Sequence, residues 1–383
     1  MKAVVLSKLI SVEALPMAGY SVVSLFSGAG FLDFGFMEHG FDVVWGCELV
    51  PYFAQAHNYN LRLRYGEGRR DTIQTADITK VSPDSIPKAA GIIGGPPCQD
   101  FSVGNANKPG VAGARGQLVW DYLDKVATVN PDFFLFENVE GLYKIRKNRE
   151  EALIPLMAQF ADLGYEVDFQ VLNALDYGIP QDRSRVFLVG VKHAIATALR
   201  IHGLPTFEFP QPIYPRAKAN FDWIDTWDYG TQVDEEDFIH ELVVPYALTV
   251  HSAIKDVPTS GLPNHVFFQP RSDKFTVIAE GDDRRKSFKR LHRFRYSPTV
   301  AYGNNEVHLH PTEPRRISVR EALRLQSVPD WYQFEEGTPL DKMFKMISNG
   351  VAFRLAELLA DQIKVVLDSY YTLEAQNAVA IIG

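Results

Sequence analysis

The sequence predicts an α/β protein in which helices cover both faces of a mostly parallel, doubly wound sheet, together with a second, smaller domain. Short apolar, β-branched runs alternate with longer helix-like stretches through the first half of the chain, as expected for parallel strands joined by helices. From residue 201 to about residue 313 this alternation gives way to Pro-rich, aromatic and charged sequence. We therefore expect the smaller domain in this middle part of the chain.

Each element follows from a local pattern. The predicted strands are 21–26 (SVVSLF), 41–47 (FDVVWGC), 91–93 (GII), 132–136 (DFFLF), 166–172 (EVDFQVL) and 185–191 (RVFLVGV). The predicted helices are 117–129, 151–164, 318–326 and 350–371, the last of them strongly amphipathic and expected to pack on the first domain. The expected domains are 1–200 with 345–383, then 201–313, joined by a hinge at 314–344.

The composition is that of a globular protein with a sizeable core. The chain has 383 residues, of which 46% are hydrophobic and 22% charged. Its two cysteines cannot supply a disulfide framework, so we expect a cytoplasmic protein. The N-terminal stretch, interrupted by Lys8 and Glu13, makes a poor signal peptide. No apolar run approaches the roughly eighteen residues that a membrane span needs, and we expect no membrane partner.

Charge is segregated along the chain. The net charge of −8 argues against a nucleic-acid partner, but residues 284–295 (RRKSFKRLHRFR) carry seven Lys or Arg with two Phe between them. Such a run predicts a phosphate-binding face, and the alternative is a solvated basic loop. Residues 222–241 carry eight acidic residues and no Lys or Arg. The pattern predicts no role for this acidic segment beyond a solvated loop or a shield against non-specific nucleic acid.

The loops after the first two strands predict a nucleoside cofactor. Gly28 and Gly30 follow the first strand and permit a tight turn at the start of a helix. Glu48 follows the second strand, twenty residues beyond Gly28, a spacing suited to an acidic residue that binds ribose hydroxyls. An ordinary glycine turn is the alternative interpretation.

Position 33 helps to distinguish which nucleoside cofactor binds. The dinucleotide fingerprint wants glycine where this chain has Asp33, which disfavours NAD. S-adenosyl-L-methionine fits the same strand and acidic-residue geometry without a pyrophosphate to bind. Asp77 in TADIT is a candidate contact to an adenine amino group, although a lone loop Asp is more often a turn or cap residue.

A rare thiol occupies a proline-rich loop after the third predicted strand. Cys98 in GGPPCQDFS could be a buried small hydrophobe, as we expect of Cys47. However, the next strand ends in ENVEG, which places Glu137 at the same edge of the sheet. A nucleophile and an acid would then face each other.

At this point the chain resembles the DNA cytosine-5 methyltransferases, in particular the prokaryotic restriction-modification type. The resemblance covers most of the chain and is carried by FSGAG, GGPPCQDFS, ENVEG, IPQDRSRVFLVG, PRRISVREALRLQSVPDWY and SNGVAF, in the family's order. It implies the Rossmann-like fold of class I S-adenosylmethionine-dependent methyltransferases, with the target-recognition domain at 201–313. It also implies S-adenosyl-L-methionine as methyl donor, S-adenosyl-L-homocysteine as product, and no metal.

The resemblance implies three sets of site residues. The catalytic set is Cys98, Glu137, Arg183 and Arg185. The cofactor set is Phe26, Gly28, Gly30, Glu48, Asp77, Ile78, Pro97, Asn349 and Val351. The DNA-binding set combines Gln99 and Ser102 with the basic residues Arg284, Arg285, Lys289, Arg290, Arg293 and Arg295.

The implied chemistry explains these residue types. Cytosine C5 is a poor nucleophile, so a Cys98 thiolate first adds to C6, C5 then takes the methyl group, and loss of the C5 proton expels the thiolate. A protonated Glu137 would donate to N3, and Arg185 would hold O2. The target base must leave the stacked duplex to reach these groups.

The chain departs from the usual family pattern at three positions near the cofactor: Ser24 replaces Asp, Phe31 replaces a second Gly, and Gly350 replaces Ser or Ala.

The expected partner is double-stranded DNA, the expected state is a monomer, and the expected functional companion is a restriction endonuclease. Alternative functions are a tRNA cytosine-5 methyltransferase, a catalytically silent DNA-binding homologue, and a NAD-dependent dehydrogenase.

Overall fold

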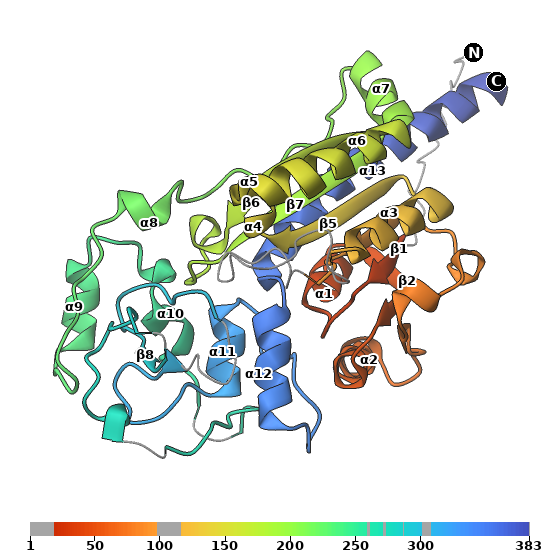
Figure 1. Ribbon diagram of the computed structural model, residues 1–383. Coiled ribbons are helices and arrows are strands. Elements are labelled where there is room, and N and C mark those ends of the chain that lie inside the picture. The colour runs from red at the N-terminus through yellow and green to blue at the C-terminus, as the bar shows by residue number, and fades with distance from the viewer. Residues whose placement is uncertain are drawn as a thin grey trace, which may run out of the picture.

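A seven-stranded sheet organises the protein (Figure 1). The computed structural model describes residues 19–97, 116–258, 261–270, 273–285, 287–300 and 308–382. The strands are β1 (Tyr20–Leu25), β2 (Phe41–Glu48), β3 (Ile73–Thr75), β4 (Gly91–Gly94), β5 (Phe133–Val139), β6 (Tyr165–Asn173) and β7 (Ser184–Lys192). All six predicted runs are strands, and the three-residue β3 lies outside those predictions.

The sheet has the order β3-β2-β1-β4-β5-β7-β6. The pairings among β3, β2, β1, β4 and β5 are parallel, whereas β7 is antiparallel to both β5 and β6. The parallel pairings bring the carboxyl ends of β1, β2, β4 and β5 to one edge. Because β7 runs the other way, its first residues lie at that same edge.

Helices cover both faces of the sheet, as the alternating pattern predicts. On one face lie α1 (Phe31–Met37), α2 (Pro51–Tyr65), α7 (His193–Ile201) and α13 (Phe353–Ile382). On the other face lie α3 (Leu118–Val129) and α6 (Ile154–Asp162). The strands supply both cores by alternation, since Phe133 joins the first apolar cluster and Phe134 the second.

The long C-terminal helix α13 packs on α1, as expected from its amphipathic sequence. The contact is close, because a Cβ added at Gly35 of α1 would lie 2.5 Å from the Cβ of Ala356. The far end of α13 extends past the sheet (Figure 1). None of the described helices is long and apolar enough to cross a membrane.

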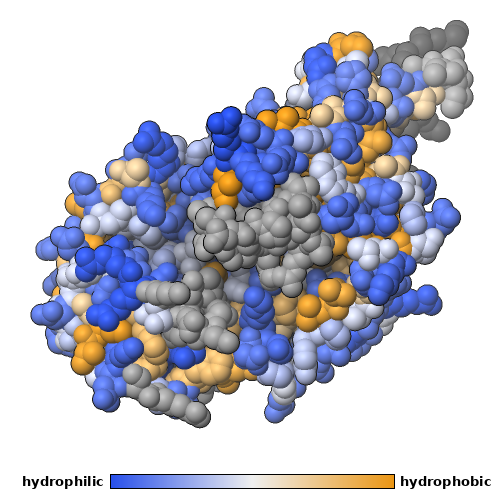
Figure 2. All heavy atoms as spheres, in the orientation of Figure 1, coloured by the Kyte–Doolittle hydropathy of each residue, from blue (hydrophilic) through white to orange (hydrophobic). Residues whose placement is uncertain are grey.

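The middle of the chain contains little regular structure. Its elements are the short helices α8 (Ala217–Asn220), α9 (Glu235–Glu241) and α10 (Val250–Ile254) and the two-residue strands β8 (Lys289–Arg290) and β9 (His308–Leu309). The helices α11 (Val319–Leu325) and α12 (Leu340–Asn349) follow them. Two further short helices, α4 (Gly141–Lys144) and α5 (Arg146–Asn148), lie earlier, between β5 and α6. Apolar residues here, such as Val250 and Leu291, belong to the same buried cluster as β1 and α13. Because one buried cluster includes residues of both predicted domains, the boundaries at residues 200 and 313 stay a prediction. The face of the molecule shown in Figure 2 is mostly hydrophilic where it is coloured, with hydrophobic residues scattered among the hydrophilic ones.

The return to regular structure at α11 follows from a local signal. Ser318 accepts a hydrogen bond from the backbone N–H of Glu321, and the Glu321 carboxylate accepts one from the backbone N–H of Ser318. Arg315 adds two hydrogen bonds of 2.8 Å to the same carboxylate. This capping box fixes the start of the helix where the pattern predicts it.

Candidate active site

A partly buried ion pair lies at the edge of the sheet where the strand ends meet. In the antiparallel register of β5 and β7, Val139 lies opposite Arg185. The Arg185 side chain reaches back to Glu137, with 3.0 Å between Nε and Oε1. Each of the two side chains is 13% exposed. The antiparallel strand thus delivers an arginine to a carboxylate at the end of a parallel strand.

The surroundings of Glu137 raise the pKa of its carboxyl. Burial raises the pKa of the Glu137 carboxyl above its ordinary value, while the charges of Arg185 and Arg183 act in the opposite direction. The loop after β4 passes directly beside this carboxyl, because a Cβ added at Gly95 would lie 2.5 Å from Glu137 Oε2. A side chain at position 95 would therefore displace the acid.

The proline-rich loop is tied to β5. Asn138, which is buried, donates a hydrogen bond of 3.2 Å from Nδ2 to the carbonyl oxygen of Pro96. Pro97 is the last residue described in this loop, and Cys98, Gln99 and Ser102 lie outside the described residues. The residues that directly precede Cys98 in the chain thus lie against the strand that carries Glu137.

Arg183 contacts a different part of the chain from Arg185. Its Nη2 donates hydrogen bonds to the carbonyl oxygens of Ser348 (2.9 Å) and Gly350 (2.7 Å), and its side chain is buried. Ser348 and Gly350 belong to the motif SNGVAF, in which two cofactor residues were predicted: Asn349 is exposed and Val351 is buried. Arg183, which directly precedes β7, therefore joins that strand to the end of α12 and the residue that follows it.

The turn after β1 has the geometry expected of a ligand-binding turn. Phe26, Gly28 and Gly30 have φ angles of 57°, 58° and 89°, in the left-handed region that favours glycine. A Cβ added at Gly28 would have no atom of the described residues within 4 Å, so this part of the structure leaves open space above the turn. A nucleoside cofactor has room to approach the backbone at this position.

Glu48 joins this turn to the next strand. Its Oε2 accepts a hydrogen bond of 3.0 Å from the backbone N–H of Gly28, and its Oε1 accepts one of 2.8 Å from that of Val50. Burial raises the pKa of the Glu48 carboxyl, and these backbone hydrogen bonds offset part of the increase. The twenty-residue spacing noted in the sequence corresponds to a direct contact.

Asp77 has the local role that the sequence left open as an alternative. Its Oδ1 accepts hydrogen bonds from the backbone N–H (3.1 Å) and the hydroxyl (2.8 Å) of Thr79, capping a short 3-10 helix over Ile78–Lys80. These hydrogen bonds lower the pKa of Asp77. Ile78 is buried in the apolar cluster beneath α3. The Asp77 Oδ2 lies 3.7 Å from the exposed Lys80 ammonium, so a ligand at this oxygen would compete only with a surface ion pair.

A buried polar network beneath the turn was not predicted from the sequence. Ser24 Oγ donates to Asp33 Oδ1 at 2.9 Å, and Asp33 Oδ2 lies 2.9 Å from His57 Nε2. All three side chains are buried. An Asp at position 24 would bring a second carboxylate against Asp33, so the departure at Ser24 suits this network. No spacing in the sequence pointed to His57, which lies mid-helix in α2.

The basic run divides into exposed and buried residues. Arg284 and Arg285 are exposed beside Asp282, whereas Lys289 and Arg295 are half-buried. Arg290 is fully buried and donates to the carbonyl oxygens of Ile278, Phe275 and His310. This burial argues against the expected phosphate contact, because the guanidinium already donates its hydrogen bonds to backbone carbonyl oxygens inside the protein.

Arg293, which was also expected to bind DNA, is likewise held inside the protein. It is buried, with hydrogen bonds of 3.1 Å to Glu280 and 2.9 Å to Glu235. Glu235 also lies 2.9 Å from His251 Nε2. Glu235 belongs to the acidic segment, so this segment gains a role that the sequence did not suggest: it docks on the basic run from within the same region.

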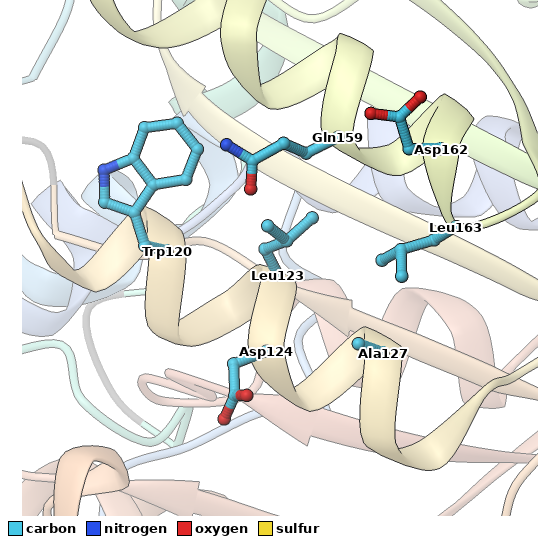
Figure 3. A pocket seen from close by; sticks show the side chains of 7 residues that line it. All are labelled: Trp120, Leu123, Asp124, Ala127, Gln159, Asp162 and Leu163. Carbon is cyan, nitrogen blue, oxygen red and sulfur yellow. The ribbon is translucent and has the colours of Figure 1, made fainter.

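A shallow pocket of about 520 Å³ lies between α3 and α6 (Figure 3). It is lined by Trp120, Leu123, Asp124, Ala127, Gln159, Asp162 and Leu163. None of the predicted site residues lines it, so the strand edge rather than this pocket is the candidate active site. Among the described residues, no group of His, Cys, Asp or Glu could hold a metal ion.

The sheet order, the glycine turn and the acidic residue after β2 define the class I S-adenosylmethionine-dependent methyltransferase fold. The same fold occurs in a prophage protein of E. coli described as a candidate DNA modification methyltransferase, with a TM-score of 0.64, 23% identity, and coverage of 91% of this chain and 100% of that chain. The particular family is C-5 cytosine-specific DNA methylase, to which this chain belongs over residues 20–365.

Two relatives support the family assignment. The Type II methyltransferase M.NmeDI of Neisseria meningitidis serogroup C is 41% identical, and the match covers 91% of this chain and 84% of the relative. The Type II methyltransferase M.FnuDI of Fusobacterium nucleatum is 30% identical, with 90% and 94% coverage. The protein is accordingly a DNA (cytosine-5-)-methyltransferase of restriction-modification type, and its family implies use of S-adenosyl-L-methionine.

Proposed function

We propose that the protein methylates C5 of one cytosine within a specific sequence of duplex DNA, through a covalent bond between Cys98 and C6 of a flipped-out base. The observation that supports the proposal most strongly is the partly buried Glu137–Arg185 pair, 3.0 Å apart, beside the loop that leads into Cys98. A base that enters this edge of the sheet would meet an acid, a cation and a thiol together.

Each residue has a defined part in the proposed reaction. The Cys98 thiolate forms a bond to C6, and Glu137, whose neutral form is favoured by burial, donates a proton or hydrogen bond at N3. Arg185 holds O2 and stabilises the charge that the addition pushes into the ring. The bound sulfonium cofactor supplies the methyl group, after which loss of the C5 proton breaks the bond to Cys98.

The residues of the glycine turn fit such a cofactor. The Glu48 carboxylate, held by two backbone N–H groups at the end of β2, would bind the ribose hydroxyls, and the described residues leave open space above Gly28. Phe26 would lie against the adenine, with Asp77 at its amino group. Pro97, Asn349 and Val351 would complete the site on the side of the methyl group.

The proposed DNA contacts come from residues 201–313 as target-recognition domain. Within the basic run, Arg284, Arg285, Lys289 and Arg295 would contact phosphates, which position the duplex without specifying its sequence. Arg290 and Arg293 are left out because they are buried. We expect a monomer that acts in the cytoplasm, paired in function with a restriction endonuclease.

The first experiment measures transfer of a labelled methyl group to duplex DNA and, in parallel, to tRNA, with Cys98→Ala as control. Label on DNA that disappears in the variant supports the proposal, and conversion mapping then identifies the target sequence. Label on tRNA alone would assign the protein to the RNA-modifying alternative. DNA binding without label on either substrate would indicate a silent homologue.

A second experiment tests the covalent step itself. In the presence of S-adenosyl-L-methionine, duplex DNA with 5-fluorocytosine at the mapped position should form a complex that survives denaturing electrophoresis, because after methyl transfer fluorine cannot leave C5 as a proton does. Cys98→Ala should form no such complex. A stable adduct in the variant would exclude Cys98 as the nucleophile.

A further inference from the structure

Phe31 and Gly350 lie in direct contact although 319 positions separate them. A Cβ added at Gly350 would lie 2.1 Å from Cδ2 and 2.7 Å from Cε2 of the Phe31 ring. Both distances are shorter than real Cβ contacts allow. With phenylalanine at position 31, only glycine fits at position 350 unless one segment moves.

The Phe31 ring is held in place from the other side. It is 2% exposed and meets the ring of Tyr332 edge-on, with 5.0 Å between the centroids. The Tyr332 hydroxyl in turn donates a hydrogen bond of 2.8 Å to the carbonyl oxygen of Ala29, within the glycine turn. Because Phe31 is fixed, a side chain at position 350 would displace the segment that contains it.

That segment also carries the partner of a buried arginine. The carbonyl oxygens of Ser348 and Gly350 accept the hydrogen bonds of Arg183. Two residues further along the chain, Arg185 forms the ion pair with Glu137. A line of contacts therefore runs from the glycine turn, through Phe31 and Gly350, to Arg183, which lies two positions before Arg185 of the candidate catalytic pair.

We propose that Phe31, Gly350 and Arg183 are positioning residues that act as one unit. The fit of Phe31 against Gly350 sets the position of Arg183. In this way the unit aligns the glycine turn with the Glu137–Arg185 pair. This inference rests on the proposed function of that pair and of the turn. It makes Arg183 a link between two binding sites, in place of a direct contact to the base.

The test is a double-mutant cycle with Gly350→Ala and Phe31→Ala. Gly350→Ala should raise KM for S-adenosyl-L-methionine and lower kcat, together reducing kcat/KM about tenfold, the size of coupling seen between side chains in contact. Adding Phe31→Ala removes the ring that the new methyl group meets. The double variant should therefore be more active than Gly350→Ala alone, although Phe31→Ala by itself leaves a cavity.

A matched control separates positioning from reduced stability. Gly190 in β7 faces a similar obstacle, since a Cβ there would lie 2.0 Å from the ring of Phe134, which is a core residue and not a predicted site residue. Gly190→Ala should lower the denaturation midpoint, with kcat and KM of the folded fraction unchanged. Arg183→Met should reproduce the combined kcat and KM change of Gly350→Ala, and Phe31→Ala should not rescue it.

Each outcome of the cycle has a definite meaning. Additive effects, or wild-type constants in Gly350→Ala, would overturn the inference, as would Arg183→Met with unchanged constants. If Gly350→Ala does not fold, Arg183→Met and the activity of the double variant provide the test. If the wild-type protein transfers no methyl group to DNA, the proposed function fails instead. Direct calorimetric binding of S-adenosyl-L-homocysteine then still reports on the fit between positions 31 and 350.

Discussion

Two Arg–Glu pairs in this protein, one partly buried and one fully buried, have different tasks. In the first, Arg185 Nε lies 3.0 Å from Glu137 Oε1 at the edge of the sheet. In the second, Arg293 Nε lies 3.1 Å from Glu280 Oε1 within the middle part of the chain. The distances are nearly equal, so the pairing itself does not distinguish a candidate catalytic group from a structural one.

Within the part of the chain that the structure describes, the two pairs differ in the number of their partners. Glu280 accepts from the backbone N–H, Nε and Nη2 of Arg293, and Arg293 also donates to Glu235 and to the carbonyl oxygen of Thr231. The second oxygen of Glu137 instead faces the backbone of Gly95, in the loop that leads to Cys98. A closed network stabilises the fold, whereas a carboxyl directed toward a loop edge can meet a substrate.

The largest expected effect is on the rate of methylation. Glu137→Gln should lower kcat by about 10²- to 10⁴-fold, because the amide cannot transfer a proton at N3. Single-turnover methylation of duplex DNA measures this change. Glu280→Gln, a matched substitution in the other pair, should leave kcat of the folded protein within about threefold. Equal decreases in the two variants would break the comparison.

The second effect is on stability. Glu280→Gln should lower the free energy of unfolding by about 3–5 kcal/mol, because it leaves the Arg293 guanidinium buried beside a neutral partner. Urea denaturation followed by circular dichroism measures the decrease. A change below about 1 kcal/mol would show that Glu235 and Thr231 alone satisfy Arg293.

The third effect is a pH dependence of stability. The folded-state pKa of Glu137 is raised above its ordinary value of 4.5 by burial, so its protonation stabilises the fold below that value. This stabilisation disappears as the pH rises through the raised pKa. Glu137→Gln should not show this decrease, so the difference in unfolding free energy between the variant and the wild type should increase with pH in the variant's favour. A difference that is constant from pH 4 upward would contradict the raised pKa.

The smallest effect concerns the basic run. Replacing Arg284 and Arg285 together by Ala should weaken DNA binding and reduce the slope of log K against log salt by about one for each phosphate that is no longer bound. Fluorescence anisotropy over a range of salt concentrations measures this slope. Arg290→Met is the control, since the Arg290 guanidinium is buried and its removal should affect folding rather than the slope.

Much of the sheet and its edge could be predicted from the sequence. Runs such as FDVVWGC and RVFLVGV are buried strands, and their apolar composition carries that information locally. Once the strands are known, Glu48 and Glu137 must lie at their carboxyl ends. The meeting of the glycine turn with Glu48, and of Glu137 with the proline-rich loop, then follows from the rule that parallel strands end at one edge.

Other features were decided only by tertiary packing. Arg290 and Arg293 have the same residue type as Arg284 and Arg285 in the same run, yet their burial depends on carbonyl and carboxylate groups from distant segments. Charge density along a chain does not encode which side chains turn inward.

The cofactor side shows the same division. The glycine turn is visible in the sequence, but the contact between Phe31 and Gly350 and the buried pair of Asp33 with His57 join residues far apart along the chain. Periodicity and local motifs determine the strands and the residues at their ends, because those signals are short-range. Which partner each of those residues meets depends on the packing of separate segments, which only the folded structure decides.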